Sequence, residues 1–353
     1  MKKTLSILVV LVLAAGVRGE RVPPAPKVRA AQWSMSSTQA VITREDARRG
    51  LGLYQKDALW GLTGAAPAAV ESLTVGVIRV SFQDLAFGSG LDGTPHDSLY
   101  FENELRHLRE YFAGASVGHF SLETILEPGI LRLSRPESYY GEDDLWEERV
   151  SEMVMETVEA LDSLVDFSRF DALALLHAGA GQETDFNGDS PGQLWSGFID
   201  PMEMAEVLAD TLGTPGVPTA DSLGGEPFYI DNVIVWPETA EQDDTFFGSL
   251  GIYAYQVGLR IGMIPLFDTT PSGFPDSQGI GQFGLMGYGL YNAVGFVPAF
   301  PSAFHRYLMG WAAPVEIGED SEVRLRDINI AGSGDTALVR IPISPSEYFL
   351  VAN

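Results

Sequence analysis

Residues 247–268 read FGSLGIYAYQVGLRIGMIPLFD, and the predicted fold is built around this stretch. Its apolar residues recur at the spacing of one helix face, which predicts a helix packed against a core. The residues of this stripe are Leu250, Ala254, Val257 and Ile261. Gly258 and Gly262 lie inside the predicted helix, where each costs about 1 kcal/mol relative to alanine. Two such glycines one turn apart indicate close approach by another backbone or by a substrate.

The same stretch resembles the active-site helix of the immune inhibitor A family of secreted bacterial zinc metallopeptidases, whose pattern is roughly HEFGHxLGLPDLYD. On that pattern the first zinc histidine falls on Tyr255, the catalytic glutamate on Gln256 and the second histidine on Leu259. The third zinc ligand, an aspartate, falls on Pro265. The positions that still fit the pattern are Gly258, Gly262, Leu266, the aromatic residue Phe267 and Asp268. The resemblance implies a metallopeptidase scaffold in which the residues at all three zinc-ligand positions and at the catalytic glutamate position have been replaced.

The residues at these four positions do not supply the chemistry of a zinc hydrolase. Zinc binds imidazole nitrogen, thiolate sulfur or carboxylate oxygen, and ligands at i and i+4 share one helix face. The side chains of Leu259 and Pro265 carry no donor atom. Tyr255 would ligate only as a phenolate, although the ordinary pKa of tyrosine is about 10. The amide of Gln256 cannot accept a proton from a zinc-bound water, so we expect neither zinc nor zinc-dependent hydrolysis.

The resemblance extends from residue 73 to residue 317. It includes an opening strand at Leu73, the segment HAGAGQE that starts at His177, and a glycine-rich turn whose Met286 the resemblance places beneath the metal site. It implies an α+β, zincin-like metallopeptidase fold, in which a twisted mixed sheet packs against the active-site helix. In such folds the sheet edge beside the helix holds an extended peptide by backbone pairing, which does not require zinc.

The rest of the chain divides into further segments. Residues 1–19 have the layout of a secretory signal peptide, with two lysines before a short apolar run and small residues at its end. Residues 20–70 begin with several prolines and are predicted to be a linker or the remnant of a propeptide. The metallopeptidase-like domain is expected over residues 71–317. Residues 318–353 are expected to begin a β-rich C-terminal domain that is cut in mid-element.

Composition limits the location and the partners. A signal peptide with no later apolar segment of about 20 residues predicts a protein that is secreted or at the cell surface, without a membrane span after signal removal. The chain has no cysteine, so neither a disulfide nor a thiol nucleophile is expected. Its net charge of −26 argues against nucleic acid as a partner. The partner implied by the resemblance is a peptide or protein, and the oligomeric state stays open.

The excess of carboxylates makes calcium the cofactor to consider. Asp185, Asn187 and Asp189 alternate as the first three ligands of a calcium-binding loop do. The pattern then ends, because Ser190 stands at the glycine position and Ser196 at the position of the bidentate glutamate. The sequence therefore favours a turn held by Asp and Asn side chains, with calcium as the weaker alternative.

Few other residues are suited to hydrolysis. The histidines are His96, His107, His119, His177 and His305, and no two have the spacing of a metal-ligand pair. His177 ends a predicted strand and is interpreted as a hydrogen-bonded scaffold residue. Ser116 lies in GASVG, which matches the G-x-S-x-G nucleophile elbow. A predicted helix precedes Ser116 and a strand follows it, which is the reverse of the order that an elbow requires.

Three functions are compatible with these observations. The first, which we favour, is a secreted pseudopeptidase that retains a peptide cleft and has lost hydrolysis. The second is an active secreted hydrolase that uses other residues. The third is a structural or adhesive domain of a larger surface protein. Zinc content and chelator-sensitive cleavage distinguish the first from an active metallopeptidase, and peptide binding distinguishes it from the third.

Overall fold

The computed structural model describes residues 20–21, 70–267, 278–318, 321–330, 335–344 and 347–353. The predicted signal peptide, most of the predicted linker and Asp268 lie outside these described residues. The described part has several helices and a mixed main sheet, so the predicted combination of α and β structure is confirmed.

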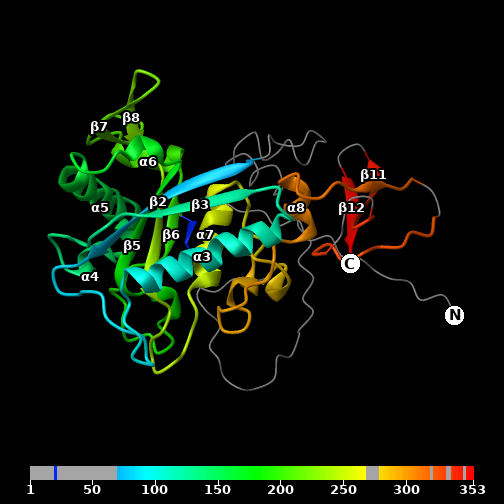
Figure 1. Cartoon of the computed structure of the whole chain (residues 1–353), viewed down its shortest axis with the longest axis horizontal. Coiled ribbons are helices and arrows are strands. Elements are labelled where there is room, and N and C mark those ends of the chain that lie inside the picture. Colours follow the sequence, from blue (N-terminus) through cyan, green and yellow to red (C-terminus); the bar gives the residue numbers. More distant parts are fainter. Residues whose placement is uncertain (1–19, 22–69, 268–277, 319–320, 331–334, 345–346) are drawn as a thin grey trace.

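A seven-stranded sheet forms the centre of the main unit (Figure 1). Its strand order is β1-β6-β9-β5-β2-β3, and β4 pairs with β2 off this path. The pairs among β2, β3, β4, β5 and β9 are parallel, whereas β6 and β1 pair antiparallel with their neighbours. The bounds are β1 (Glu20–Arg21), β2 (Ser72–Ser81), β3 (Ser121–Leu126), β4 (Leu131–Arg132), β5 (Ala172–Ala180), β6 (Gly197–Ile199) and β9 (Val233–Thr239).

The central strands are buried on both faces, as strands of a parallel sheet usually are. In β2, Leu73 and Val75 contribute to one hydrophobic cluster, whereas Ile78 and Val80 contribute to the other. The residues of β5 and β9 alternate in the same way, because successive side chains of a strand point to opposite faces. The sheet therefore has one hydrophobic core on each side.

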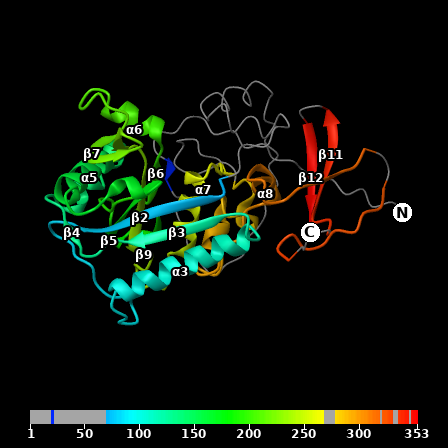
Figure 2. The same ribbon diagram turned by 45° about the horizontal axis from the view of Figure 1, so that its top comes forward.

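One face of the sheet is covered by α3 (Ser98–Ala115) and α7 (Leu250–Arg260) (Figure 2). The carboxylate of Asp97 begins α3 by accepting a hydrogen bond from the N–H of Tyr100 at 3.0 Å. Three shorter elements complete this side of the molecule: η4 (Gly281–Phe283), η5 (Tyr288–Tyr291) and α8 (Ala303–Leu308).

The opposite face is covered by α5 (Trp146–Leu161) and α6 (Pro201–Leu208). α6 begins with a complete capping box between Asp200 and Glu203, which explains why it starts directly after β6. It ends at Leu208. The remaining short elements are α4 (Glu137–Tyr140), η1 (Asp143–Leu145), η2 (Phe167–Arg169), η3 (Gln182–Thr184) and the hairpin β7 (Val217–Leu223) with β8 (Glu226–Ile230).

α7 is the helix predicted from residues 247–268, but it has no exposed face. Every residue from Gly251 to Leu259 is buried. A Cβ atom on Gly251 would overlap the carbonyl oxygen of Leu290, so η5 packs directly on the helix backbone. The predicted helix packed against a core is therefore confirmed, and the sheet and the η5 segment together enclose it.

Gly262 lies beyond the end of α7, so its prediction as an interior helix residue is wrong. Its φ is +96°, a left-handed value that favours glycine. The N–H of Met263 bonds the carbonyl of Gly258 at 2.9 Å, and the N–H of Gly262 bonds the carbonyl of Leu259 at 2.9 Å. These two bonds form the glycine-dependent motif that terminates helices. A Cβ atom at Gly262 would meet nothing within 4 Å, so conformation rather than close approach explains this glycine.

The C-terminal strands form a second sheet, seen at the right of Figure 1. Its order is β10 (Val315–Glu316), β11 (Leu338–Ser344) and β12 (Glu347–Ala352). β10 lies before the boundary expected between residues 317 and 318. Arg306 of α8, which is only 1% exposed, donates to the carbonyl of Ile328 at 3.1 Å and to Oδ1 of Asn329 at 2.6 Å. The C-terminal segment is therefore fastened to the main unit.

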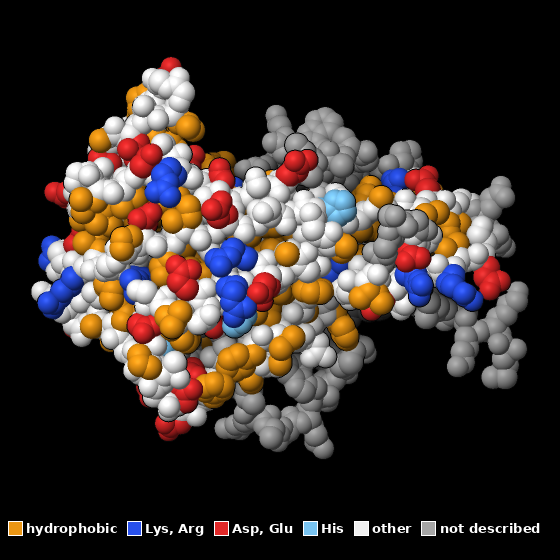
Figure 3. Space-filling model, viewed as in Figure 1, with side chains coloured by type: hydrophobic (Ala, Val, Ile, Leu, Met, Phe, Trp, Pro, Cys, Tyr) orange, Lys and Arg blue, Asp and Glu red, His pale blue; other side chains and the backbone are white. Residues whose placement is uncertain are grey.

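The lengths of the helices and the charges on the surface concern two kinds of partner, a membrane and a highly charged molecule. Among the described residues, no helix combines the length and the apolar character that crossing a membrane requires. The face drawn in Figure 3 mixes acidic and basic side chains and shows no broad patch of either sign.

We predict that Gly251→Ala lowers the free energy of unfolding by several kcal/mol, because a backbone carbonyl leaves no space for the methyl group. The matched control is Gly114→Ala in α3, where the nearest atom to a Cβ is the ring edge of Phe300 at 3.4 Å. Alanine at residue 114 should be neutral or stabilising by up to about 1 kcal/mol, since it favours the helix. Urea unfolding of both variants measures the difference, and equal effects would contradict the packing described for α7.

Candidate functional site

The orientation of α7 follows from two side chains that bond the sheet side of the molecule. The hydroxyl of Tyr253 donates to the carbonyl of Pro237 at 2.7 Å, and Nε of Arg260 donates to Oδ1 of Asn232 at 3.0 Å. Gln256 is three residues after Tyr253 and four before Arg260, so it lies on the same row of the helix. This row faces β9 and the residue that precedes it.

Gln256, which stands at the catalytic glutamate position of the resemblance, is a buried residue without solvent contact. It is 0% exposed, and neither Oε1 nor Nε2 has a hydrogen-bond partner among the described residues. An unpartnered buried polar group typically costs about 1–3 kcal/mol. The side chain therefore occupies a place where a titrating carboxylate would be strongly disfavoured.

The two histidine positions of the resemblance also lie in the core. Tyr255 is 0% exposed and Leu259 is 6% exposed, and both belong to the cluster on the α7 side of the sheet. The ring of Tyr255 lies 6.5 Å from that of Phe267, between centroids. Pro265 is buried as well. These residues do not fit a zinc ion, because Leu259 and Pro265 offer no donor and the surroundings are apolar.

Met286 packs against α7 at Gly258. A Cβ atom on Gly258 would lie 2.7 Å from the sulfur of Met286, and Met286 itself is 0% exposed. The close approach predicted at Gly258 exists, but it comes from this side chain; the expectation of another backbone is wrong there. Gly251 is the helix position that meets a backbone. Met286 thus fills the space beneath the helix as an ordinary apolar residue.

His177 is held at the carboxyl-terminal end of β5. It is 0% exposed, its Nδ1 lies 2.9 Å from the carbonyl oxygen of Ala178, and its ring packs on Phe82 with centroids 5.8 Å apart. Burial lowers the pKa of His177 to about 4, so its ring is neutral at pH 7. Nε2 has no partner among the described residues. These contacts agree with a scaffold role.

The other predicted candidates also have structural surroundings. Ser116 is the C-cap residue of α3, and its Oγ accepts a hydrogen bond from the N–H of Phe120 at 3.1 Å. His305 is buried with Nε2 3.0 Å from the carbonyl oxygen of Ile264, and burial lowers its pKa to about 4. His107 and His119 are exposed.

The acidic turn at residues 185–189 gains a member that the local sequence pattern did not include. Asp185, Asp189 and Asp243 each place one carboxylate oxygen within 4.8 Å of the others. The backbone N–H of Asn187 donates to Oδ2 of Asp243 at 2.8 Å. The carboxylate of Asp185 accepts from the backbone N–H groups of Gly188, Asp189 and Ser190. The predicted Asx-rich turn is present, and these carboxylates are where a hard cation would find oxygen ligands.

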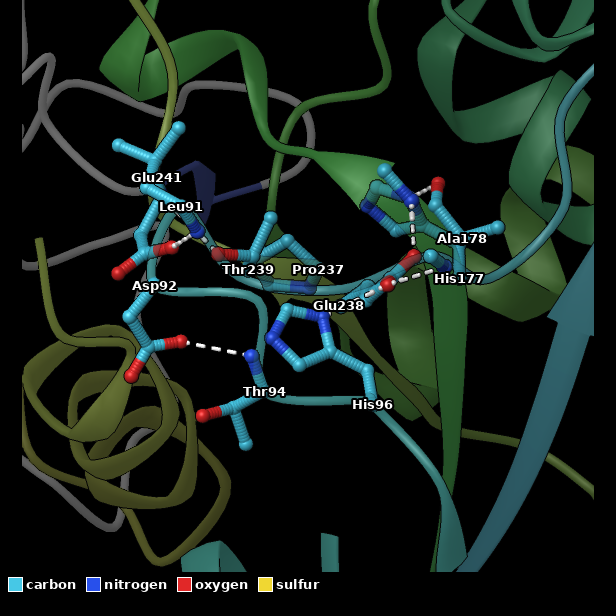
Figure 4. Close-up of polar contacts among 12 residues, drawn as sticks. Leu91, Asp92, Thr94, His96, His177, Ala178, Pro237, Glu238, Thr239 and Glu241 are labelled. Atoms are coloured by element: carbon cyan, nitrogen blue, oxygen red, sulfur yellow. Dashed lines mark hydrogen bonds and ion pairs between the residues drawn. The ribbon is translucent and has the colours of Figure 1, made fainter. Parts of the chain in front are cut away.

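A buried polar group at the carboxyl ends of the parallel strands was missed by sequence reasoning (Figure 4). Glu238 is 3% exposed, and its Oε1 lies 2.7 Å from Nδ1 of His96. The same carboxylate accepts from the backbone N–H of Gly88 at 2.7 Å and of Gly179 at 2.8 Å. The ring of His96 stacks on Tyr100, with centroids 4.2 Å apart. Glu238 thus joins the loop after β2 to the ends of β5 and β9.

The opposite edge of His96 faces other acidic residues. A Cβ atom on Gly90 would lie 3.3 Å from Nε2 of His96, 3.2 Å from Oδ1 of Asp92 and 3.0 Å from Oε2 of Glu241. A histidine with a carboxylate on one nitrogen is the arrangement that orients a general base. Among the described residues, however, no hydroxyl is hydrogen-bonded to His96. Among the described residues, His96 and Glu238 therefore connect structural elements, and no nucleophile is bonded to the histidine.

The third group of interest positions β6, the antiparallel strand at one side of the sheet. Glu183 is 2% exposed; its carboxylate accepts from Oγ of Ser196 at 2.6 Å and from the N–H of Ser196 at 3.2 Å. Burial raises the pKa of Glu183. On the other side, Nε1 of Trp146 donates to the carbonyl of Trp195 at 3.1 Å. Glu183 belongs to the HAGAGQE segment, so this motif holds the residues that lead into β6.

Comparison with known proteins does not identify a family for this chain. No family model matches the chain, and no curated protein matches its sequence.

We predict that Gln256→Met raises the free energy of unfolding by about 1–3 kcal/mol, because methionine has a similar shape and removes two unpartnered polar atoms. Denaturant unfolding at neutral pH provides the measurement. A marked loss of stability would show instead that the amide has an essential partner.

Gln256→Glu is the matched test of the same site, and it should destabilise the protein at neutral pH. Burial without a partner raises the pKa of a carboxyl above the unfolded value of about 4.3. The folded state then binds more protons than the unfolded state, so stability falls as pH rises above about 4.3. The variant should approach wild-type stability only at acidic pH, and a pH-independent difference would contradict this environment.

Proposed function

We propose that this protein is a secreted pseudopeptidase on a zincin-like scaffold, which binds an extended peptide and does not hydrolyse it with zinc. The observation that carries this proposal is the burial of Tyr255, Gln256 and Leu259 in the core around α7. A catalytic metal needs donor atoms and an open position for water. These positions supply neither, and the enclosure of α7 by η5 leaves the helix without an exposed face.

Peptide binding is supported by the contrast between α7 and β6. The residues at the three zinc-ligand positions and the catalytic glutamate position, on and after α7, have side chains that do not bind a metal. The residues that position β6, by contrast, are held by hydrogen bonds: Glu183 accepts from Ser196, and Trp146 donates to Trp195. An ordered strand near the edge of a sheet recognises an extended chain through its backbone and needs no metal, and β6 is separated from that edge only by the two-residue β1.

Location and cofactor belong to the same proposal. The predicted signal peptide supports export to the exterior or to the cell surface. Calcium stays the weaker expectation for Asp185, Asn187 and Asp189, because a group of carboxylates alone does not identify an ion.

The proposal predicts that the purified protein contains far less than one zinc per chain and does not cleave a denatured protein substrate, with or without chelator. Elemental analysis after equilibration with excess zinc and removal of free metal measures the first quantity, and gel electrophoresis of the substrate measures the second. Calcium is counted in the same analysis. Stoichiometric zinc together with chelator-sensitive cleavage would overturn the proposal.

A second candidate is a hydrolase that uses His96, favoured by the 2.7 Å contact between its Nδ1 and Glu238. Its signature would be chelator-insensitive cleavage that is lost in His96→Gln but retained in His107→Gln. His107 is the matched control because it is an exposed histidine of α3. Absence of both cleavage and peptide binding would instead favour the structural or adhesive domain.

A further inference from the structure

We propose that Asp92, His96 and Glu241 form a binding site for a small organic cation that carries a guanidinium group. The inference goes beyond the proposed function and does not depend on it, because none of the three residues belongs to α7 or to β6. It starts from an unused acceptor, the ring nitrogen Nε2 of His96, which faces two carboxylates.

The three residues lie where open parallel sheets commonly bind ligands. Asp92 and His96 belong to the loop between β2 and α3, and Glu241 follows β9 by two residues. β2 pairs with β3 on one side and with β5 on the other, and α3 and α5 pack on opposite faces of the sheet. Such sheets bind ligands at the carboxyl ends of the strands, at the point where the connections diverge in this way.

Glu238 fixes the orientation of His96. Its carboxylate accepts from the backbone N–H groups of Gly88 and Gly179, and its Oε1 lies 2.7 Å from Nδ1 of His96. Because a carboxylate is an acceptor, we assign the proton of this contact to Nδ1, and Nε2 of the neutral ring is then an acceptor. The side chain of His96 is 2% exposed, and Nε2 has no hydrogen bond within the described part of the chain.

Two carboxylates face this free nitrogen. A Cβ atom on Gly90 would lie 3.3 Å from Nε2 of His96, 3.2 Å from Oδ1 of Asp92 and 3.0 Å from Oε2 of Glu241, so the three atoms surround one point. Figure 4 shows both carboxylates on the side of the His96 ring that is turned away from Glu238. Three acceptors therefore converge, and glycine at residue 90 leaves the space between them free.

Both carboxylates are held by the backbone and lack a cationic partner. Oδ1 of Asp92 accepts from the N–H of Thr94 at 2.8 Å, and Oε2 of Glu241 accepts from the N–H of Leu91 at 2.7 Å. No lysine or arginine among the described residues forms an ion pair with either carboxylate. Asp92 is exposed and Glu241 is partly exposed, so a ligand from solvent can reach them.

The negative charge extends beyond these two residues. The ring of Tyr100 stacks on that of His96, with centroids 4.2 Å apart. Burial and the charges of nearby carboxylates raise the pKa of Tyr100, and these carboxylates belong to Glu104, Glu241, Glu238 and Asp92. Carboxylates gathered at a partly buried site concentrate a negative potential, which attracts a cation.

The spacing of the acceptors favours a guanidinium over a metal ion. Among the described residues, three ligand atoms lie within 4.8 Å of one another at Asp185, Asp189 and Asp243, and the His96 group does not meet this limit. Ligands of one metal ion lie at most about 5 Å apart, since each bond is about 2.0–2.6 Å long. A guanidinium has five N–H donors in one plane, and each hydrogen bond adds about 2.9 Å, so it bridges acceptors that are farther apart.

The test measures binding of agmatine, in which a short chain joins a guanidinium to an ammonium group. Isothermal titration calorimetry at neutral pH gives the dissociation constant. N-(4-aminobutyl)urea is the matched ligand control, because a neutral urea replaces the guanidinium. Nitrogen NMR of the imidazole groups reports Nδ1 and Nε2 separately, and the signals of His96 are those that disappear in His96→Gln.

Three variants change the site in different ways. Glu241→Gln and Asp92→Asn each remove one charge and keep an oxygen for the backbone N–H. Gly90→Ala keeps every polar group and places a methyl group among the three acceptors; residue 90 does not have the left-handed backbone that favours glycine. Glu102→Gln is the matched control, because Glu102 is an exposed residue of α3.

We expect agmatine to bind and to shift the Nε2 signal of His96 more than its Nδ1 signal. Its affinity should fall at least about tenfold in each of the three variants and stay unchanged in Glu102→Gln. The urea compound should bind at least about tenfold more weakly than agmatine, since it lacks the charge on the donor group.

Absence of binding at about 10 mM agmatine would overturn the site, and so would equal affinity for the urea compound. An equal loss of affinity in Glu102→Gln and Glu241→Gln would also overturn it, because it would show general attraction to an acidic protein. A His96 ring that carries protons on both nitrogens at neutral pH without ligand would do the same, since Nε2 would then be a donor. None of these results concerns zinc content or cleavage, so the proposed function is tested separately.

Discussion

The enclosure of α7 is the constraint on which the rest of the structure depends. The carbonyl oxygen of Leu290 lies where a side chain at Gly251 would begin, and Tyr253 bonds the end of β9 on the other side. A helix held this closely between a sheet and a loop has no exposed face for solvent, a metal or a substrate. The apolar character of Leu259 follows from that position, whereas the unpartnered amide of Gln256 is unfavourable there.

Under the proposed function, the molecule separates two properties that a metallopeptidase combines. Zinc-dependent hydrolysis would require metal-ligand atoms and a water molecule at α7, and the buried surroundings of this helix supply neither. Recognition of a chain in extended form requires only an ordered strand with accessible backbone groups; β6 is ordered by Glu183 and Trp146, and β1 pairs with its outer side. In that proposal, absence of the first property does not disturb the second, because the two groups of residues lie on different elements.

Local pattern was enough to predict the central helix, β2 and β5, because each is a periodic apolar segment with a clear boundary on at least one side. It was not enough to distinguish Gly262, whose left-handed backbone conformation ends the helix, from a glycine inside it. Contacts distant in sequence were missed as well. Glu238 is 142 residues from His96, and Asp243 is remote from the turn that contains Asp185. Such pairs cannot be predicted from a local pattern, because their two members are far apart in the sequence.

Arg306 has a consequence for how the protein comes apart. Its guanidinium is buried and bonds Pro301, Ile328 and Asn329, so it spans the junction between the main unit and the C-terminal segment. Removing that segment would leave a buried cation with most of its acceptors missing, which is strongly unfavourable. We therefore expect the main sheet and the C-terminal sheet to unfold together, and a proteolytic cut after α8 to weaken the whole molecule instead of releasing an intact core.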